Sequence, residues 1–169
     1  MNLLEVKNLS KTYKINRAFR ASLNLQALRG VSLFVKPGET LAVVGESGCG
    51  KSTLAKLLMK IEEKSGGEAW IDGREIGKIN SKELPSHLQM IFQDPYSSLN
   101  PRKKIFDIVA EPLIIAGQNS EKIKASVEEV ASLVGLRPEI LGRYPHMLSG
   151  GQRQRVGIAR ALVTRPKLI

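Results

Sequence analysis

The amino-acid sequence predicts an α/β fold with a helical insertion, and three patterns in its 169 residues support this. Residues 3–6 and the alternating run 31–35 are typical of strands and predict an N-terminal β part. The apolar run 41–44 predicts a buried strand that leads through a glycine-rich loop into a helix ending near Ile61. From about residue 94 to residue 149 the pattern is helical, so we expect a helical subdomain inserted into the α/β core.

The N-terminal β part is expected to be antiparallel. Residues 65–67 and the pair Asp72-Gly73 are turn sequences, and they bracket a short strand pattern at residues 68–71. Such closely spaced turns favour a hairpin, which joins neighbouring strands in the antiparallel sense.

Two helices are predicted in the insertion. The first covers residues 105–116 and is expected to be interrupted by Pro112, because proline cannot donate a helical hydrogen bond. The second runs from Ser120, a fair N-cap, to about Val134, with Gly135 as its stop signal. Its apolar stripe is formed by Ile123, Val127, Val130 and Val134.

A phosphate-binding loop is predicted where the strand at 41–44 meets the following helix. Gly45 and Gly50 permit backbone angles closed to other residues, so successive amide groups can turn inward around a polyphosphate at the positive end of the helix. Lys51 would add a mobile positive charge, and the Ser52 hydroxyl is placed to bind Mg²⁺. The alternative is a glycine-rich turn with an ordinary surface lysine. The predicted loop comprises Gly45, Glu46, Ser47, Gly48, Cys49, Gly50, Lys51, Ser52 and Thr53.

A second glycine-rich segment also opens a helix, which is expected to begin near Ser149 or Gly150. Val156, Ala159 and Val163 fall on one face of that helix, and we expect Arg153, Arg160 and other polar groups around the remainder. Taken alone, Gly-Gly followed by a basic helix is more typical of a loop and a solvated helix face than of a functional site. Beside a phosphate loop it indicates a second phosphate site. The segment comprises Leu148, Ser149, Gly150, Gly151 and Gln152.

The sequence Leu-Ser-Gly-Gly-Gln resembles the signature motif of the ATP-binding subunits of ABC transporters. The resemblance implies a P-loop NTPase core with an N-terminal antiparallel β part and an inserted helical subdomain. It also implies that the signature meets the phosphate loop of a second ATPase subunit, so that two ATP molecules are clamped in a head-to-tail dimer. On this basis the chain divides into an ATP-binding core at residues 1–93, a helical subdomain at 94–149, and the signature helix with the start of a further strand at 150–169.

Two more residues correspond to family positions. Gln93 ends the strand-like stretch 87–92 and resembles the glutamine that contacts Mg²⁺ and the attacking water, which gives it a catalytic role together with Lys51. Tyr13 resembles the aromatic residue that stacks on adenine; the competing interpretation is a half-buried strand aromatic. The implied cofactors are ATP and Mg²⁺, with Ser52 and Gln93 as metal ligands.

The subfamily is indicated by residues 93–102 and 143–155, which resemble the ATPases of dipeptide, oligopeptide and nickel importers. Such a subunit hydrolyses ATP to drive import. Its implied partners are a second ATPase subunit, membrane-spanning permease subunits and, indirectly, a solute-binding protein. The implied location is cytoplasmic and peripheral, at the inner face of the membrane. The solute is bound elsewhere, so these residues do not choose between a peptide and a metal complex.

The sequence departs from the family pattern at its end. Residues 165–169 resemble the opening of the Walker B strand, but the acidic pair that follows it in the family is absent. We therefore interpret the chain as the N-terminal part of a longer ATPase and expect it to be inactive alone, because the general base is missing.

Charge and composition limit the alternatives. The net charge of +10 leaves open a nucleic-acid-linked ATPase of the DNA-repair or translation type, although no zinc spacing or helix-turn-helix pattern accompanies it. No apolar run approaches the roughly 20 residues of a membrane span, and the start lacks the pattern of a signal peptide. The only cysteine, Cys49, cannot form an internal disulfide and fits a reducing compartment.

Overall fold

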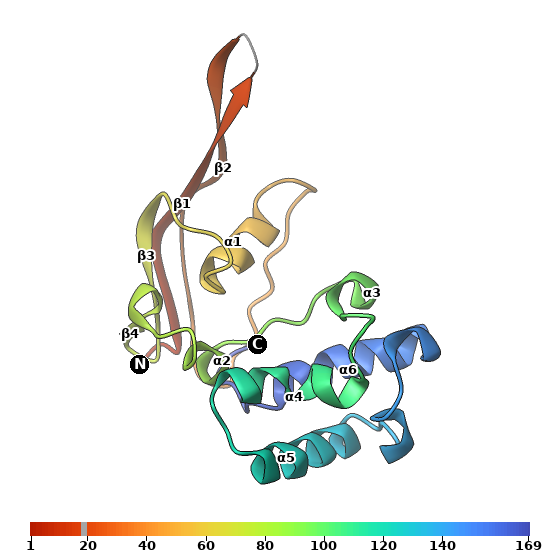
Figure 1. Cartoon of the computed structure of the whole chain (residues 1–169). Coiled ribbons are helices and arrows are strands. Elements are labelled where there is room, and N and C mark those ends of the chain that lie inside the picture. The colour runs from red at the N-terminus through yellow and green to blue at the C-terminus, as the bar shows by residue number, and fades with distance from the viewer. Residues whose placement is uncertain (18–19) are drawn as a thin grey trace. The chain divides into compact units, whose positions relative to one another are not determined.

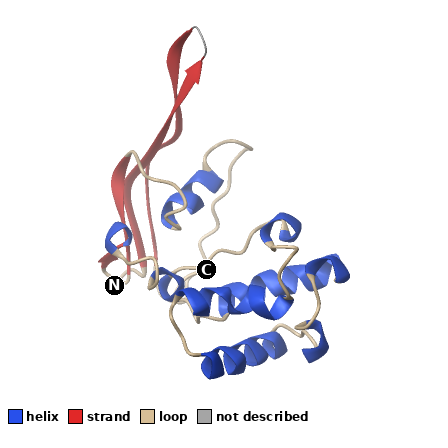
Figure 2. Ribbon diagram, viewed as in Figure 1, coloured by secondary structure: helices blue, strands red, loops and turns tan. Residues whose placement is uncertain are grey.

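The computed structural model describes residues 1–17 and 20–169 and contains two compact units, residues 1–79 and 80–169. All strands assigned among the described residues lie in the first unit, and the second is built of helices and loops (Figure 1, Figure 2). The α/β class predicted from the sequence is therefore confirmed.

The first unit contains a four-stranded antiparallel sheet in the order β2-β1-β3-β4. This confirms the predicted N-terminal β part and the hairpin after residue 65, whose turn residues Asp72 and Gly73 have φ values of 50° and 73°. The first two strands are much longer than their apolar cores suggested. The strand bounds are β1 Leu4–Arg17, β2 Arg20–Val35, β3 Gly66–Ile71 and β4 Arg74–Glu75.

A β-bulge keeps the apolar residues of β1 on the core side of the sheet. Leu4 and Val6 alternate inward, and the register then shifts between Val6 and Leu9. Asn8 adopts a left-handed φ of 47° within this shift. The extra residue lets Leu9 face the core as well, although it lies three positions after Val6.

The outer part of the β1–β2 hairpin has one apolar face. Tyr13 lies opposite Leu25, and Ile15 lies opposite Leu23, so these four side chains share a face. β3 pairs with β1 only as far as Ser10, and the hairpin continues beyond it (Figure 1). Three of the four are strongly exposed: Ile15 at 40%, Leu23 at 44% and Leu25 at 50%.

The predicted strand at residues 41–44 is wrong. These residues pair with no strand in the described part of the chain, and Leu41, Val43 and Val44 are exposed. A strand exists only where a neighbour completes its hydrogen bonds, and an apolar run alone cannot supply that neighbour.

The helix after the loop is present but shorter than predicted. Helix α1 spans Lys51–Leu58 and ends before Ile61, because Lys60 adopts a left-handed φ of 56° just beyond the C-cap Met59.

The second unit packs helices around one apolar core. The predicted helix at 105–116 is α4, and the predicted helix after Ser120 is α5; both pack with α6. Short 3-10 helices lie at Pro138–Ile140 and Pro145–Met147, and another, Ile76–Lys78, lies in the first unit. The α-helices are α2 Leu84–His87, α3 Pro95–Ser98, α4 Ile105–Ile115, α5 Ser120–Leu133 and α6 Gly150–Leu162. The core includes Ile105, Ile108, Val109, Val127, Val156 and Ala159.

Two details of the helical predictions are corrected. Pro112 does not interrupt α4, which continues to Ile115 because Val109 and Leu113 on either side of the proline are buried in the core. The N-cap of α5 is Asn119 rather than Ser120, since the Asn119 side chain accepts a hydrogen bond from the amide of Lys122 at 2.9 Å. The predicted stop at Gly135 is confirmed by its φ of 71°.

The stretch before Gln93 does not form the predicted strand. Only Leu88 pairs, in a single parallel bridge with Leu168. The amide of Gln89 donates to the Leu168 carbonyl at 3.1 Å, and the amide of Leu168 donates to the His87 carbonyl at 3.1 Å. This isolated bridge lies where the sequence suggested that a strand begins, but no strand is assigned there among the described residues.

Candidate nucleotide site

The phosphate loop, residues 45–53, wraps from an extended segment into the first turn of α1. Gly48 and Gly50 have φ values of 82° and 104°, in the region that favours glycine. At Gly50 a side chain is also excluded by space, because a Cβ would lie 2.5 Å from the backbone oxygen of Ala27 in β2. No side chain caps the start of α1, and its first turn contains no acidic residue. The backbone amides there are thus available to an anion.

Lys51 folds back over the loop. Its ammonium group donates hydrogen bonds to the carbonyls of Gly45 and Glu46, both at 2.7 Å, and lies 3.5 Å from the Cys49 sulfur. These contacts hold a positive charge at the centre of the loop. A phosphate oxygen is a stronger, charged acceptor than a carbonyl, so the ammonium can exchange these partners for it.

The donor groups of the loop fit a polyphosphate. A metal ion would be held mainly by the phosphate and by water, with few protein ligands. Among the described residues, no group of three or more His, Cys, Asp or Glu side chains could hold a metal ion. Mg²⁺ commonly keeps phosphate and water oxygens and takes only one or two protein ligands. The exposed Ser52 hydroxyl, in the first turn of α1, offers one such oxygen.

Tyr13 is tied to the segment that follows α1. Its hydroxyl donates to the Glu62 carboxylate, and it also interacts with the Thr53 hydroxyl in the first turn of α1. The Glu62 hydrogen bond raises the pKa of Tyr13, and the Tyr13 hydroxyl in turn lowers the pKa of Glu62. The structure thus connects the predicted base-stacking residue with the phosphate loop through one helix.

Gln93 lies in the second unit, exposed, just before α3. The next residue, Asp94, caps α3 by accepting a hydrogen bond from the amide of Tyr96 at 2.8 Å. This cap holds the backbone that directly follows Gln93.

Two arginines of α6 hold the α3 segment, and we call them the arginine clamp. Arg160 donates to the Ser98 carbonyl at 2.7 Å, and its guanidinium lies 5.7 Å from the centre of the Phe92 ring. Arg153 donates to the Pro145 carbonyl at 2.8 Å, and its guanidinium lies 4.0 Å from the centre of the Tyr96 ring. Burial lowers the pKa of Arg160, although a guanidinium remains charged in proteins.

The clamp corrects the expectation that Arg153 and Arg160 lie around the polar remainder of α6. Arg153 is only 8% exposed. Positions 153, 156, 160 and 163 recur at helical spacings of three and four, so both arginines share the face of Val156 and Val163. That spacing was readable in the sequence.

The signature segment, residues 148–152, forms the start of α6. Ser149 is the N-cap: its hydroxyl accepts from the Gln152 amide at 3.3 Å, and the Gln152 side chain accepts from the Ser149 amide at 3.0 Å. Leu148 is buried and anchors the segment in the core. Gly150 and Gly151 are exposed, and a Cβ on either would meet no atom within 4 Å.

Sequence reasoning missed Glu62 and Lys11. Both are ordinary charged residues in strand and loop sequence, and no local pattern links them to Tyr13. Only the pairing of β1 with β3, and the turn that follows α1, bring them together.

Among the described residues, no helix combines the length and the apolar character needed to cross a bilayer.

Comparisons with known proteins show the family of the chain. The di/tripeptide transport ATP-binding protein DppF of Pseudomonas aeruginosa is 47% identical over 99% of this chain, and the oligopeptide transport ATP-binding protein OppF of Haemophilus influenzae is 46% identical over the same share. The chain spans about half the length of these relatives, 53% of each. A solved dimer of MJ0796, a bacterial ABC transporter cassette, matches with a TM-score of 0.80 and 30% identity over 96% of this chain and 70% of that one. The family profile described as ABC transporter matches residues 28–169. The chain therefore belongs to the ABC transporter family.

Proposed function

We propose that the complete protein containing this chain is the ATP-binding and ATP-hydrolysing subunit of a membrane importer for peptides or related solutes. The names of the relatives support the solute class, since they are di/tripeptide and oligopeptide transport proteins. A solved neighbour, the dimeric cassette bound to ADP and Pi in a post-hydrolysis state, supports nucleotide hydrolysis in a dimer.

One observation carries the proposal: the fold of this chain requires glycine in the first glycine-rich segment but not in the second. Gly50 is required by this chain, because its φ is positive and Ala27 of β2 leaves no room for a side chain. Gly150 and Gly151 are required by nothing in the chain, since they have ordinary backbone angles and open space around them. Glycine also weakens a helix relative to alanine. A group outside the chain that approaches the backbone closely would explain why glycine occupies both position 150 and position 151.

The proposed roles follow from these positions. The loop amides and Lys51 hold the triphosphate, and Ser52 binds Mg²⁺ with it. Tyr13 stacks on adenine, and Gln93 positions the metal and the attacking water. Ser149, Gly150, Gly151 and Gln152, anchored by Leu148, complete the site of a second ATPase subunit in a head-to-tail dimer. Bound MgATP supplies the phosphoryl group that is transferred to water. The arginine clamp would carry the position of the Gln93 segment to the signature helix.

The subunit would work at the inner face of the membrane, bound to membrane-spanning permease subunits that receive solute from a binding protein. The nucleic-acid-linked alternative gains no support from the family match or from the relatives.

The Gly151→Ala variant tests the proposal. Nothing within the chain opposes the new methyl group, so the fold should be as stable as the wild type or slightly more stable. MgATP should still bind each subunit, but ATP-dependent pairing, followed by analytical ultracentrifugation of the complete protein, should be lost together with turnover. A control is Gly157→Ala in the same helix: Gly157 is buried, but the added Cβ would also meet no atom within 4 Å. If Gly151→Ala pairs and hydrolyses ATP like the wild type, the signature segment does not serve a partner's site.

A further inference from the structure

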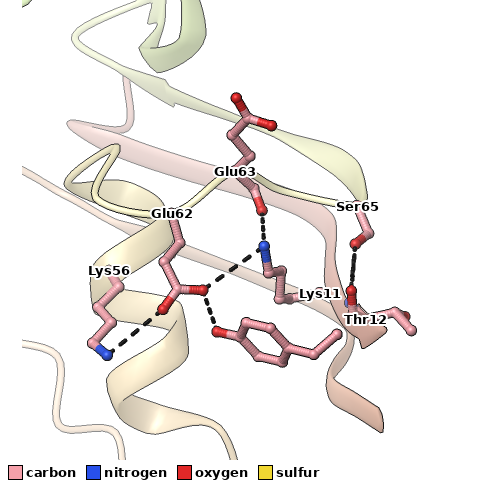
Figure 3. A network of polar contacts seen from close by, with 7 residues as sticks. Lys11, Thr12, Lys56, Glu62, Glu63 and Ser65 are labelled. Atoms are coloured by element: carbon pink, nitrogen blue, oxygen red, sulfur yellow. Dashed lines mark hydrogen bonds and ion pairs between the residues drawn. The ribbon is translucent and has the colours of Figure 1, made fainter. Parts of the chain in front are cut away.

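We propose that Glu62 is a positioning residue for the nucleobase: it fixes the Tyr13 ring in the orientation that stacks on adenine. This inference rests on the proposed nucleotide site and adds to it a residue outside the phosphate loop, the glutamine and the signature segment. It is carried by Tyr13, Glu62, Lys11 and Lys56, which we call the tyrosine tether: the Tyr13 hydroxyl donates to the Glu62 carboxylate, and Figure 3 shows that carboxylate with the two lysines.

The Tyr13 ring lies at the base of an exposed apolar strip. Leu25 is directly opposite Tyr13 in the β1–β2 register, and the pair Ile15 and Leu23 follows on the same face. The exposure of these three side chains leaves apolar surface beside the ring. A planar base that stacks on Tyr13 can cover part of this surface, which favours binding.

The Tyr13 hydroxyl is bound by the Glu62 carboxylate, which two lysines hold in place. Glu62 accepts a hydrogen bond from Tyr13, and it pairs with Lys11 at 3.7 Å and with Lys56 at 3.6 Å. Figure 3 shows the two lysines reaching the carboxylate from different elements, Lys11 from the sheet and Lys56 from α1. The carboxylate therefore has little freedom to turn away from the tyrosine.

One face of the ring is occupied. The Lys11 ammonium lies 4.8 Å from the ring centre, and it is fixed there by a hydrogen bond of 2.6 Å to the Glu63 carbonyl. The Lys11 side chain is only 14% exposed. A base can stack only on the opposite face, so Lys11 and Glu62 together determine both the angle of the ring and the side on which it is open.

The tether also sets the distance from the base to the phosphates. Lys56 belongs to α1, and Glu62, which binds the Tyr13 hydroxyl, follows the end of that helix. The same helix begins at the phosphate loop. A ligand that contacts both the loop and the ring therefore meets two subsites attached to one rigid element, which lowers the entropic cost of binding.

The experiment separates the base from the phosphates. The complete protein is titrated with MgATP and, separately, with magnesium tripolyphosphate, which lacks base and sugar. Glu62→Ala should weaken MgATP binding about five- to tenfold, the typical effect of one hydrogen bond, and leave tripolyphosphate binding unchanged. Glu62→Gln keeps a carbonyl acceptor for the hydroxyl and should restore most of the affinity. Glu63→Ala is the matched control, because it removes the neighbouring charge while its backbone carbonyl still holds Lys11.

A double-mutant cycle decides whether Glu62 acts through Tyr13. Tyr13→Phe keeps the ring and removes the hydroxyl, so it should weaken MgATP binding as Glu62→Ala does. The double variant should show no further loss. Additive losses, equal losses for both ligands, or unchanged MgATP affinity in Glu62→Ala would each overturn the inference. If the wild type binds MgATP no better than tripolyphosphate, the inference fails but the phosphate site stands; if it binds neither, the proposed function itself fails.

Discussion

Replacing Gly50 by alanine should lower the free energy of unfolding and weaken nucleotide binding, for two reasons that the structure shows. The φ of 104° is a conformation that costs a residue with a side chain about 1–3 kcal/mol. The new methyl carbon would also lie 2.5 Å from the Ala27 oxygen and 3.2 Å from Cδ1 of Leu28. Because the first of these atoms is backbone in a paired strand, the loop must move, at an overpacking cost of about 1–3 kcal/mol.

The two costs together amount to roughly 2–6 kcal/mol, against a typical stability of about 5–15 kcal/mol. Gly38→Ala separates them. Gly38 has a φ of 74° but open space around it, so this variant should show only the backbone cost.

The assay is urea unfolding of the complete protein with and without MgATP. At a ligand concentration 100 times the Kd, binding adds about 2.7 kcal/mol to the free energy of unfolding. The wild type and Gly38→Ala should gain this increment, and Gly50→Ala should lose most of it, because a displaced loop no longer aims its amides at the phosphates. If Gly50→Ala costs no more stability than Gly38→Ala and keeps the full increment, the loop is not shaped by its contact with β2.

Three further predictions follow from individual contacts. Asn119→Ala removes the N-cap of α5 and should lower the free energy of unfolding by about 0.5–2 kcal/mol in urea titrations, whereas Ser120→Ala, at the position first expected to be the cap, should change it little. Arg160→Met keeps the apolar stem but removes the charged hydrogen bond to the α3 segment, worth about 1.5–3 kcal/mol; hydrogen exchange of residues 95–99 should accelerate, and unchanged protection would show that the arginine clamp does not hold that segment. The pKa of Glu62 is lowered in the folded protein, chiefly by the tyrosine hydroxyl and then by its two lysines, so its stabilising effect should be complete above pH about 4.3 and be lost as the pH falls through the lowered value. The stability difference between wild type and Glu62→Gln, measured by acid titration of unfolding, should therefore be constant near neutral pH and narrow below that value; a constant difference down to pH 2 would contradict the tether.

The sequence predicted those features that depend on local chemistry. Gly50 signalled a sharp turn before α1 because its positive φ favours glycine, and Ser149 signalled the start of α6 because a hydroxyl satisfies a free amide there. Gly135 ended α5 for the same kind of reason. In each case the cause lies within a few residues of the signal.

Features that depend on distant partners were not predictable in the same way. The apolar run 41–44 suggested a strand, but strand formation requires a neighbour that the described residues do not provide. Arg153 was expected to be solvated because it is charged, although its spacing places it on the buried face of α6. Glu62 carried no signal at all, since its contact with Tyr13 joins residues 49 positions apart.

The central claim is that backbone amides of the phosphate loop, together with Lys51, hold the triphosphate of ATP. Isothermal titration calorimetry of MgATP into the complete protein tests it most directly, with Lys51→Ala as the comparison. We predict saturable uptake near one nucleotide per chain by the wild type, and binding weakened at least about tenfold in the variant, which loses a charge-assisted contact. Absence of uptake by the folded wild type, or equal affinity in Lys51→Ala, would contradict the account.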